Sequence, residues 1–262
     1  MTGGPGTAAD DLGYPVRLSR PARRVVSLVP SLTEAVAVTR PGALAGATSW
    51  CTHPAGLDVP RVRGTKNPDR AAVAALRPDI VLANQEENRR VDVERLRAAG
   101  ISVWVTVIRT LDEAITSLRR LFTVALGWPE PPWLGEAEQV WRDPSPPPRR
   151  TAVIAVWRDP WMVVGPDTFT GDLAARLGLD NLYGAGPGRY PQVTLDDLTG
   201  RGPELIVLPD EPYAFSPDDG PEVFPGRPVA LVTGRSLTWY GPSLVTARAL
   251  LSAQLAAARP RP

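Results

Sequence analysis

Aromatic residues in this sequence gather in short segments that directly follow apolar runs. Such rings offer large flat apolar faces, which a site for a flat or partly apolar molecule would use. The alternative is that each ring folds back onto the core of its own domain, and for a single ring the two readings weigh about equally. Several rings at one rim favour a binding site. The candidates are Trp50, Trp157, Trp161, Tyr190, Tyr213, Trp239 and Tyr240.

Polar residues occupy the same kind of segment. NQEENRR follows one apolar run and PDEPY follows another, so an acidic pair stands at each position. These acids could bind a cation, orient ligand hydroxyls or amides, or pair with arginines; solvated loop acids and salt bridges are the alternative. Acids of an enzyme would show the same pattern, with Glu86, Glu87, Asp210 and Glu211 as the candidates. The predicted polar contacts to a ligand are Asn84, Glu86, Glu87, Asn88, Arg158 and Glu211.

The sequence contains one cysteine and one histidine, Cys51 and His53. Together they could supply two ligands to a soft metal or a corrinoid cobalt. Two ligands do not complete a zinc site, and a turn-forming role for His53 before Pro54 is the alternative. A histidine-based catalytic triad could use only His53. We assign no catalytic residue, and a single cysteine excludes an internal disulfide.

Three apolar runs recur at a constant spacing. RRVVSLV is followed 126 residues later by RRTAVIAVW, LRPDIVL has its counterpart in RGPELIVL, and ISVWVT has one in RPVALVT. Asp79 and Glu204, which precede the second pair of runs, are 125 residues apart. Three matches in register indicate that the architecture itself is duplicated.

These runs lack alternation, which is typical of parallel strands buried on both faces. Helical patterns lie between them, one starting at Asn67-Pro68-Asp69 with Asn67 as its cap. The sequence therefore predicts an α/β protein with two Rossmann-like lobes, each an open, mainly parallel sheet flanked by helices. The lobes would span 20–122 and 150–257, joined by a helical and Pro-rich connector, 123–149. A small-molecule ligand is expected beyond the carboxyl ends of the strands, in a cleft between the lobes.

The bulk composition excludes several classes. The 262 residues carry a net charge of +1, and no basic stripe indicates nucleic-acid binding. No apolar run reaches the length of a membrane span. The first residues lack the pattern of a signal peptide, so the chain as written is expected in the cytoplasm, or outside it if the start is mis-assigned or trimmed. We expect a monomer.

Four segments carry a family resemblance: DDLGYPVRLSRPARRVVSLVPSLTEAV, GATSWCTHP, GTKNPDRAAVAALRPDIVLANQEEN and RYPQVTLDDL. They resemble the helical-backbone metal receptors, the class III substrate-binding proteins of ABC importers that bind cobalamin or iron siderophores. The resemblance spans about residues 10–251 and is strongest to the cobalamin-binding branch. It implies two Rossmann-like lobes joined by a long helix, which the Pro-rich connector here lacks.

The resemblance also implies roles for particular residues. Trp50, Tyr190 and Trp239 match aromatic positions that contact the ligand, whereas Asn84 replaces a family aromatic. Asp69 and Asp196 match acids that dock the membrane permease, where the family has the longer Glu. The predicted function is capture of a cobalamin-like corrinoid or metal chelate, for import with an ABC permease and without a required cofactor. The alternative is a cytoplasmic enzyme or ligand sensor on the same scaffold.

Overall fold

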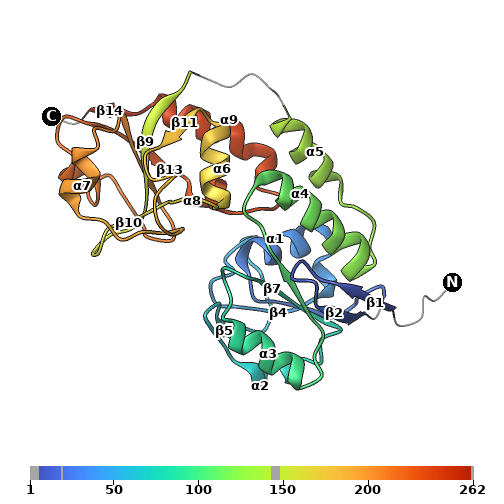
Figure 1. The fold of residues 1–262 in the computed structure, drawn as a ribbon. Coiled ribbons are helices and arrows are strands. Elements are labelled where there is room, and N and C mark those ends of the chain that lie inside the picture. Colours follow the sequence, from blue (N-terminus) through green and yellow to red (C-terminus); the bar gives the residue numbers. More distant parts are fainter. Residues whose placement is uncertain (1–5, 19, 143–147, 261–262) are drawn as a thin grey trace. The chain divides into compact units, whose positions relative to one another are not determined.

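The computed structural model describes residues 6–18, 20–142 and 148–260, which divide into two units (Figure 1). The described residues within 1–108, 112–136 and 240–242 form the first unit. Those within 109–111, 137–239 and 243–262 form the second. The predicted boundaries at 20–122, 123–149 and 150–257 stay a prediction.

The first unit is built on a parallel sheet with the strand order β4-β3-β7-β8. Figure 1 shows α1 on one face of this sheet and α2 and α3 on the other. The strands are β3 (Val25–Ser27), β4 (Leu44–Ala47), β7 (Ile80–Asn84) and β8 (Val103–Thr106). Two hairpins are added, β1 (Gly6–Ala9) with β2 (Pro15–Leu18), and β5 (Arg63–Gly64) with β6 (Asn67–Pro68). The helices are α1 (Pro30–Thr39), η1 (Pro41–Ala43), α2 (Arg70–Ala75), α3 (Arg90–Ala98), α4 (Leu111–Arg120) and the π-helical η2 (Leu121–Leu126).

The second unit contains the parallel order β11-β9-β12-β13, with short antiparallel strands β10 on β9 and β14 on β13. Its strands are β9 (Arg150–Trp157), β10 (Met162–Val163), β11 (Leu179–Asn181), β12 (Leu205–Pro209), β13 (Pro228–Val232) and β14 (Arg259–Pro260). Its helices are α5 (Pro132–Trp141, which begins in the first unit), α6 (Phe169–Arg176), α7 (Leu195–Gly200), η3 (Pro221–Val223), α8 (Gly234–Thr238) and α9 (Leu244–Ala256).

The predicted duplication is confirmed in both strand order and local detail. β3, β7 and β8 occupy the same places in the first sheet as β9, β12 and β13 in the second. Asp79 accepts hydrogen bonds from the backbone amides of Arg23 and Arg24 at 2.7 and 2.9 Å. Glu204 accepts them from the amide and hydroxyl of Thr151 at 2.7 and 2.9 Å. In each unit, therefore, the repeated acid fixes the start of the central strand.

The central strands are buried because helices cover both faces of each sheet. All residues of β3, β7, β8 and β12 are buried, which explains their apolar sequences. Turn chemistry ends the helices where the sequence suggests: Gly127 and Gly178 have φ of 65° and 81°, a left-handed conformation that favours glycine.

One predicted helix start is wrong by two residues. Asn67 and Pro68 form the short strand β6, and Asp69 is the N-cap of α2, accepting a 3.0 Å hydrogen bond from the Ala72 amide. The hairpin wins this stretch because Asn67 pairs with Gly64 across its turn.

The predicted connector is tied down at both ends by tryptophans. Trp128 donates to the Ala22 carbonyl and Trp133 to the Thr39 hydroxyl, both at 3.0 Å within the first unit. Trp141 donates to the Leu244 carbonyl at 2.9 Å within the second. Residues 143–147 of the Pro-rich stretch lie outside the described residues. Within the described part, no helix is both long and apolar enough to cross a membrane.

Candidate functional site

In the first unit, Trp50 lies in the loop after β4, and its side chain is among the most exposed apolar groups described, at 68%. The β5–β6 hairpin supports this loop, since the Ser49 amide donates to the Arg63 carbonyl at 2.7 Å. A Cβ atom on Gly64 would lie 3.3 Å from the indole nitrogen of Trp50 and 2.5 Å from Asn67 Oδ1. The indole therefore lies against the glycine backbone, and an exposed ring is held in place.

The strand order changes direction between β3 and β7, and open α/β sheets bind ligands at the carboxyl side of such a switch point. Asn88 spans this position. Its side chain donates to the Leu28 carbonyl after β3 at 3.3 Å and to the Thr65 carbonyl of the hairpin at 2.9 Å, while it accepts from the Asn84 amide. One buried amide group thus connects three loops of the first unit.

Asn84 is also buried and organises the loop that follows β7. Its Oδ1 accepts from the amides of Glu86 and Glu87 at 2.8 and 3.3 Å, and its Nδ2 donates to the carbonyl and hydroxyl of Thr106. Both Asn84 and Asn88 were predicted to contact a ligand. Their internal bonds favour a positioning role for both side chains.

The acidic pair of this loop lies beside an amine that the sequence reasoning missed. Lys66, at the tip of the β5–β6 hairpin, donates to the backbone carbonyl of Glu86. Burial raises the pKa of the half-buried Glu87 carboxyl, against the opposing effect of the nearby Lys66 charge. A signal was present in the composition, because Lys66 is the single lysine among 29 basic residues.

The equivalent switch point of the second unit lies between β9 and β12, and two rings meet across it. Trp157, at the end of β9 and 42% exposed, is in edge contact with Tyr213 beyond β12, with ring centroids 5.4 Å apart. Phe215 lies 4.6 Å from Tyr213 and stacks on the buried Trp161 at 5.8 Å. A row of aromatic contacts thus leads from the surface into the core. Trp161 was predicted to contact a ligand, and this packing favours a core role for it instead.

Charged groups hold this aromatic row in place. Arg158 forms ion pairs with Asp219 and Glu222, and its guanidinium lies 5.8 Å from the Trp161 ring. The Tyr213 hydroxyl donates to Asp219 at 2.6 Å. That hydrogen bond and the Arg158 charge hold the pKa of Asp219 below its ordinary value of 3.8. Glu222 also has a lowered pKa: burial opposes this shift, and hydrogen bonds from backbone amides and Arg158 outweigh it. We name Arg158, Asp219, Glu222 and Tyr213 the clamp.

Acid should open the clamp. Groups with a native pKa below the unfolded value stabilise the fold above that unfolded value, and the effect is lost as the pH falls through the native pKa. For Asp219 and Glu222 the ordinary values are 3.8 and 4.5, so we expect tryptophan emission to be constant above pH 5 and to change below about pH 4. Asp219→Asn should move this change to higher pH; an unaltered profile in the variant would contradict the assignment.

The other predicted residues of the second unit lie in less open positions. Tyr190 is half-buried, and Trp239 is buried with the Arg235 guanidinium 5.9 Å from its ring. Glu211 packs against the start of α8, where a Cβ on Gly234 would lie 2.5 Å from Glu211 Cγ. Asp210 accepts from the Gly234 amide at 2.6 Å. Tyr240 is buried and belongs to the first unit.

The Cys51 thiol is enclosed rather than presented. It is fully buried between the hydroxyls of Thr33 and Thr48, at 3.0 and 3.1 Å, and burial raises its pKa. His53 is half-buried and shares a 3.1 Å hydrogen bond with Thr52. The described residues contain no group of three or more His, Cys, Asp or Glu side chains that could hold a metal ion. This environment argues against a metal pair of Cys51 and His53.

The two predicted docking acids lie at equivalent helix starts but differ in their use. Asp69 caps α2 and has Arg63 3.9 Å away. Asp196 is exposed in the first turn of α7, next to Asp197, which accepts from Tyr183 at 2.7 Å. The structure therefore leaves Asp196 the more accessible carboxylate.

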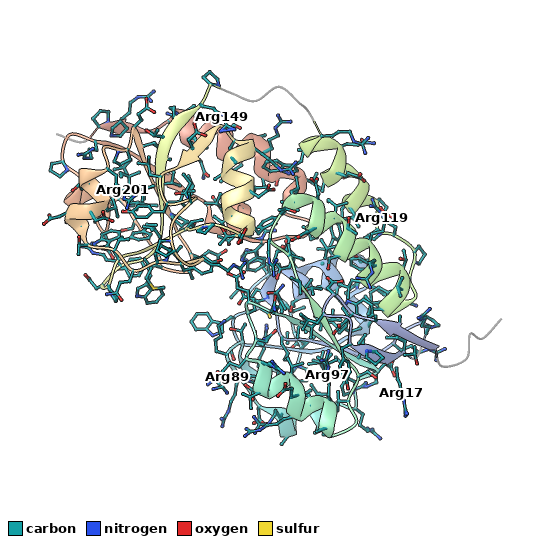
Figure 2. The ribbon with its side chains drawn as sticks, in the orientation of Figure 1. Arg17, Arg89, Arg97, Arg119, Arg149 and Arg201 are labelled. Atoms are coloured by element: carbon teal, nitrogen blue, oxygen red, sulfur yellow. The ribbon has the colours of Figure 1, made fainter. Side chains whose placement is uncertain are left out.

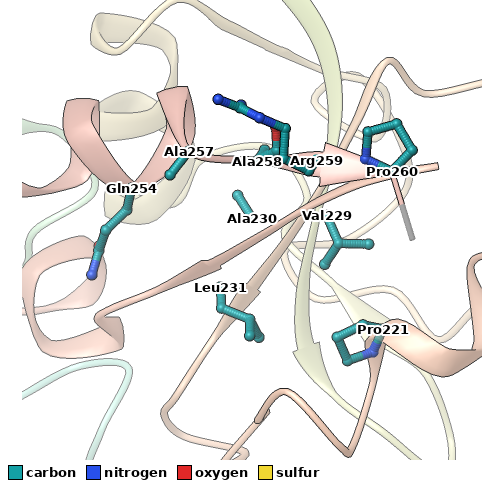
Figure 3. A pocket seen from close by; sticks show the side chains of 9 residues that line it. All are labelled: Pro221, Val229, Ala230, Leu231, Gln254, Ala257, Ala258, Arg259 and Pro260. Carbon is teal, nitrogen blue, oxygen red and sulfur yellow. The ribbon is translucent and has the colours of Figure 1, made fainter. Parts of the chain in front are cut away.

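Two surface pockets within the described residues lie away from these strand ends. One, of about 310 Å³, lies at the edge of the second sheet, where Figure 3 shows β13 between the end of α9 and β14. The other, of about 630 Å³, lies in the first unit beside the β1–β2 hairpin and α4. Neither includes a residue predicted to contact the ligand, so neither takes the place of the strand-end loops.

Comparison with known proteins returns binding proteins of one kind. No family model matches the chain. It is 24% identical over 253 residues to a vitamin B12-binding protein of Pectobacterium carotovorum, covering 91% of this chain and 90% of that protein. The crystal structure of the periplasmic vitamin B12 binding protein BtuF of Vibrio cholerae matches with a TM-score of 0.71 and 17% identity, covering 90% and 97% of the two chains. The periplasmic heme-binding protein RhuT from Roseiflexus sp. RS-1 matches with a TM-score of 0.74 and 19% identity, covering 89% and 98%.

The fold and these matches together define a class III substrate-binding protein, as the sequence resemblance predicted. Within that class, the curated sequence relatives reported above lie in the cobalamin-binding branch. The similar proteins are binding proteins rather than enzymes, so the enzyme alternative is not favoured.

The predicted cytoplasmic location is wrong. The similar solved structures are periplasmic binding proteins, which indicates an extracytoplasmic location. The prediction took the first residues as written for the start of an unexported chain, an inference that the relatives overturn.

Proposed function

We propose that this protein captures a cobalamin-like corrinoid, or another flat metal chelate, at the strand-end loops and delivers it to an ABC permease. The observation that carries the proposal is Trp50: an indole that is 68% exposed yet held against Gly64. A large exposed ring costs hydration free energy, and a flat apolar ligand recovers it by covering the ring face. The sequence relatives named for vitamin B12 binding support a corrinoid as the ligand.

The rings of the second unit support the same type of ligand. Trp157 and Tyr213 present a second aromatic surface at the equivalent switch point, and the clamp fixes it before a ligand arrives. Preorganised aromatic contacts lose little side-chain entropy on binding. The cleft between the lobes stays a prediction, as does permease docking through Asp69 and Asp196. We expect a monomer that needs no cofactor of its own.

Titration of the purified protein with cyanocobalamin tests the proposal. We expect saturable quenching of tryptophan emission and a higher melting temperature, since a ligand that binds only the folded state stabilises it. Hemin and a ferric siderophore serve as parallel ligands that identify the chelate class. No response to any of the three compounds would contradict the proposed function.

A further inference from the structure

We propose that Lys66 recognises an anionic group at the edge of the bound ligand, a phosphate or a carboxylate, and so determines which chelates bind. The proposal rests on the proposed function and adds a chemical requirement to it. It begins from the composition: of 29 basic residues only this one is a lysine, and it lies beside the exposed indole loop.

The position of the amine follows from the hairpin. Thr65 and Lys66 form the two-residue turn between β5 and β6, which places Lys66 at the tip, one residue from Asn67 and two from Gly64. Gly64 and Asn67 surround the Trp50 indole edge. The Asn88 bond to the Thr65 carbonyl, at 2.9 Å, fixes the turn itself. The ammonium group therefore lies beside the candidate aromatic contact on a braced turn.

The donors of Lys66 are only partly used. An ammonium group has three N–H donors. Among the described residues, its hydrogen-bond acceptor is the backbone carbonyl of Glu86, and the side chain is exposed. Two donors thus remain available to an oxygen anion. A ligand that covers Trp50 would exclude water around this contact and strengthen it.

The neighbouring acids do not cancel the positive charge. Glu87 is half-buried, and burial disfavours its ionised form, which weakens its repulsion of a ligand anion. Arg63, on the same hairpin, and Arg89 and Arg90, at the start of α3, add positive charge to this face of the first unit. Figure 2 shows Arg89 at that end of α3.

The experiment pairs anionic ligands with neutral counterparts. Cyanocobalamin carries a phosphodiester, which dicyanocobinamide lacks; hemin carries two carboxylates, which its dimethyl ester lacks. We expect Lys66→Ala to weaken binding of one anionic ligand about tenfold and leave its neutral counterpart within twofold, the size of a charge-assisted hydrogen bond. Loss in the cobalamin pair assigns a phosphate, and loss in the hemin pair assigns a carboxylate. Lys66→Arg, which keeps the charge, should recover most of the affinity.

The outcomes separate this inference from the proposed function. Equal weakening of both members of a pair would show that Lys66 only positions the loop, and unchanged binding of both would show no role; either result overturns the inference while the proposed function stands. If the unaltered protein binds none of the four compounds, the proposed function itself fails. Equal melting temperatures of the variants would show that the fold is intact.

Discussion

Replacement of Asp10 by alanine is expected to destabilise the first unit by about 3–5 kcal/mol, the cost of breaking a buried ion pair. The Asp10 side chain has no exposed surface. Its Oδ1 accepts from the amides of Leu12 and Tyr14 at 3.0 and 2.9 Å. Its Oδ2 accepts from Arg97 at 2.5 Å and from the Val105 amide at 3.2 Å. The variant would leave a guanidinium and three amides without their acceptor.

Arg97 makes this loss severe. Its side chain is only 12% exposed, and its guanidinium lies 3.6 Å from the Tyr14 ring, so water cannot readily replace the carboxylate. Arg97 comes from α3 (Figure 2), whereas Asp10 follows β1, so the pair fastens the N-terminal hairpin to the sheet. Urea unfolding followed by tryptophan emission measures the change, because Trp104 is fully buried in the same unit.

A matched control lies on the same helix. Glu94 pairs with Arg90 at 2.6 Å, but both side chains are exposed, so Glu94→Ala should change the stability by less than about 0.5 kcal/mol. If Asp10→Ala and Glu94→Ala had the same effect, the buried pair would not hold the hairpin.

Replacement of Trp50 by alanine is expected to weaken binding of the captured chelate by about 30-fold, the effect of a central aromatic contact. The ring is exposed in the free protein, so its removal leaves no cavity in the core and the melting temperature should stay within a few degrees. Isothermal titration with the ligand found by the screen above measures the affinity.

Two variants separate the ring itself from its support. Trp50→Phe keeps an aromatic face and should retain most of the affinity. Gly64→Ala keeps the indole but places a methyl group 3.3 Å from its nitrogen and 2.5 Å from Asn67 Oδ1, so the ring must shift and binding should weaken less than in Trp50→Ala. An affinity of Trp50→Ala within twofold of the unaltered protein would exclude the indole from the site.

Much of the fold could be predicted from residues that act locally. The runs that became β7 and β12 are apolar throughout, and only a strand covered on both faces satisfies such a sequence. The 125-residue spacing of Asp79 and Glu204 revealed the repeat, since each acid caps the central strand of its own unit. The Asn67 helix start failed because a two-residue turn and a helix cap use similar residues.

The roles of individual site residues were less accessible. Trp157 and Trp161 are four positions apart in one loop and look alike in sequence, yet one lies 42% exposed and the other is stacked on Phe215 in the core. Nothing local distinguishes them, because the partner rings come from beyond β12. Asn84 and Asn88 likewise resemble ligand contacts until the carbonyls of Leu28, Thr65 and Thr106 are in place.

The sequence by itself determined the α/β class, the two equivalent sheets and the strand ends where polar and aromatic side chains gather, because burial pattern and helix caps are properties of short segments. The tertiary structure alone decided which of those side chains remain open to a ligand. Hydrogen bonds and ring contacts between loops far apart in the chain enclosed Cys51 and Trp161, and left Trp50 and Lys66 exposed on the first unit.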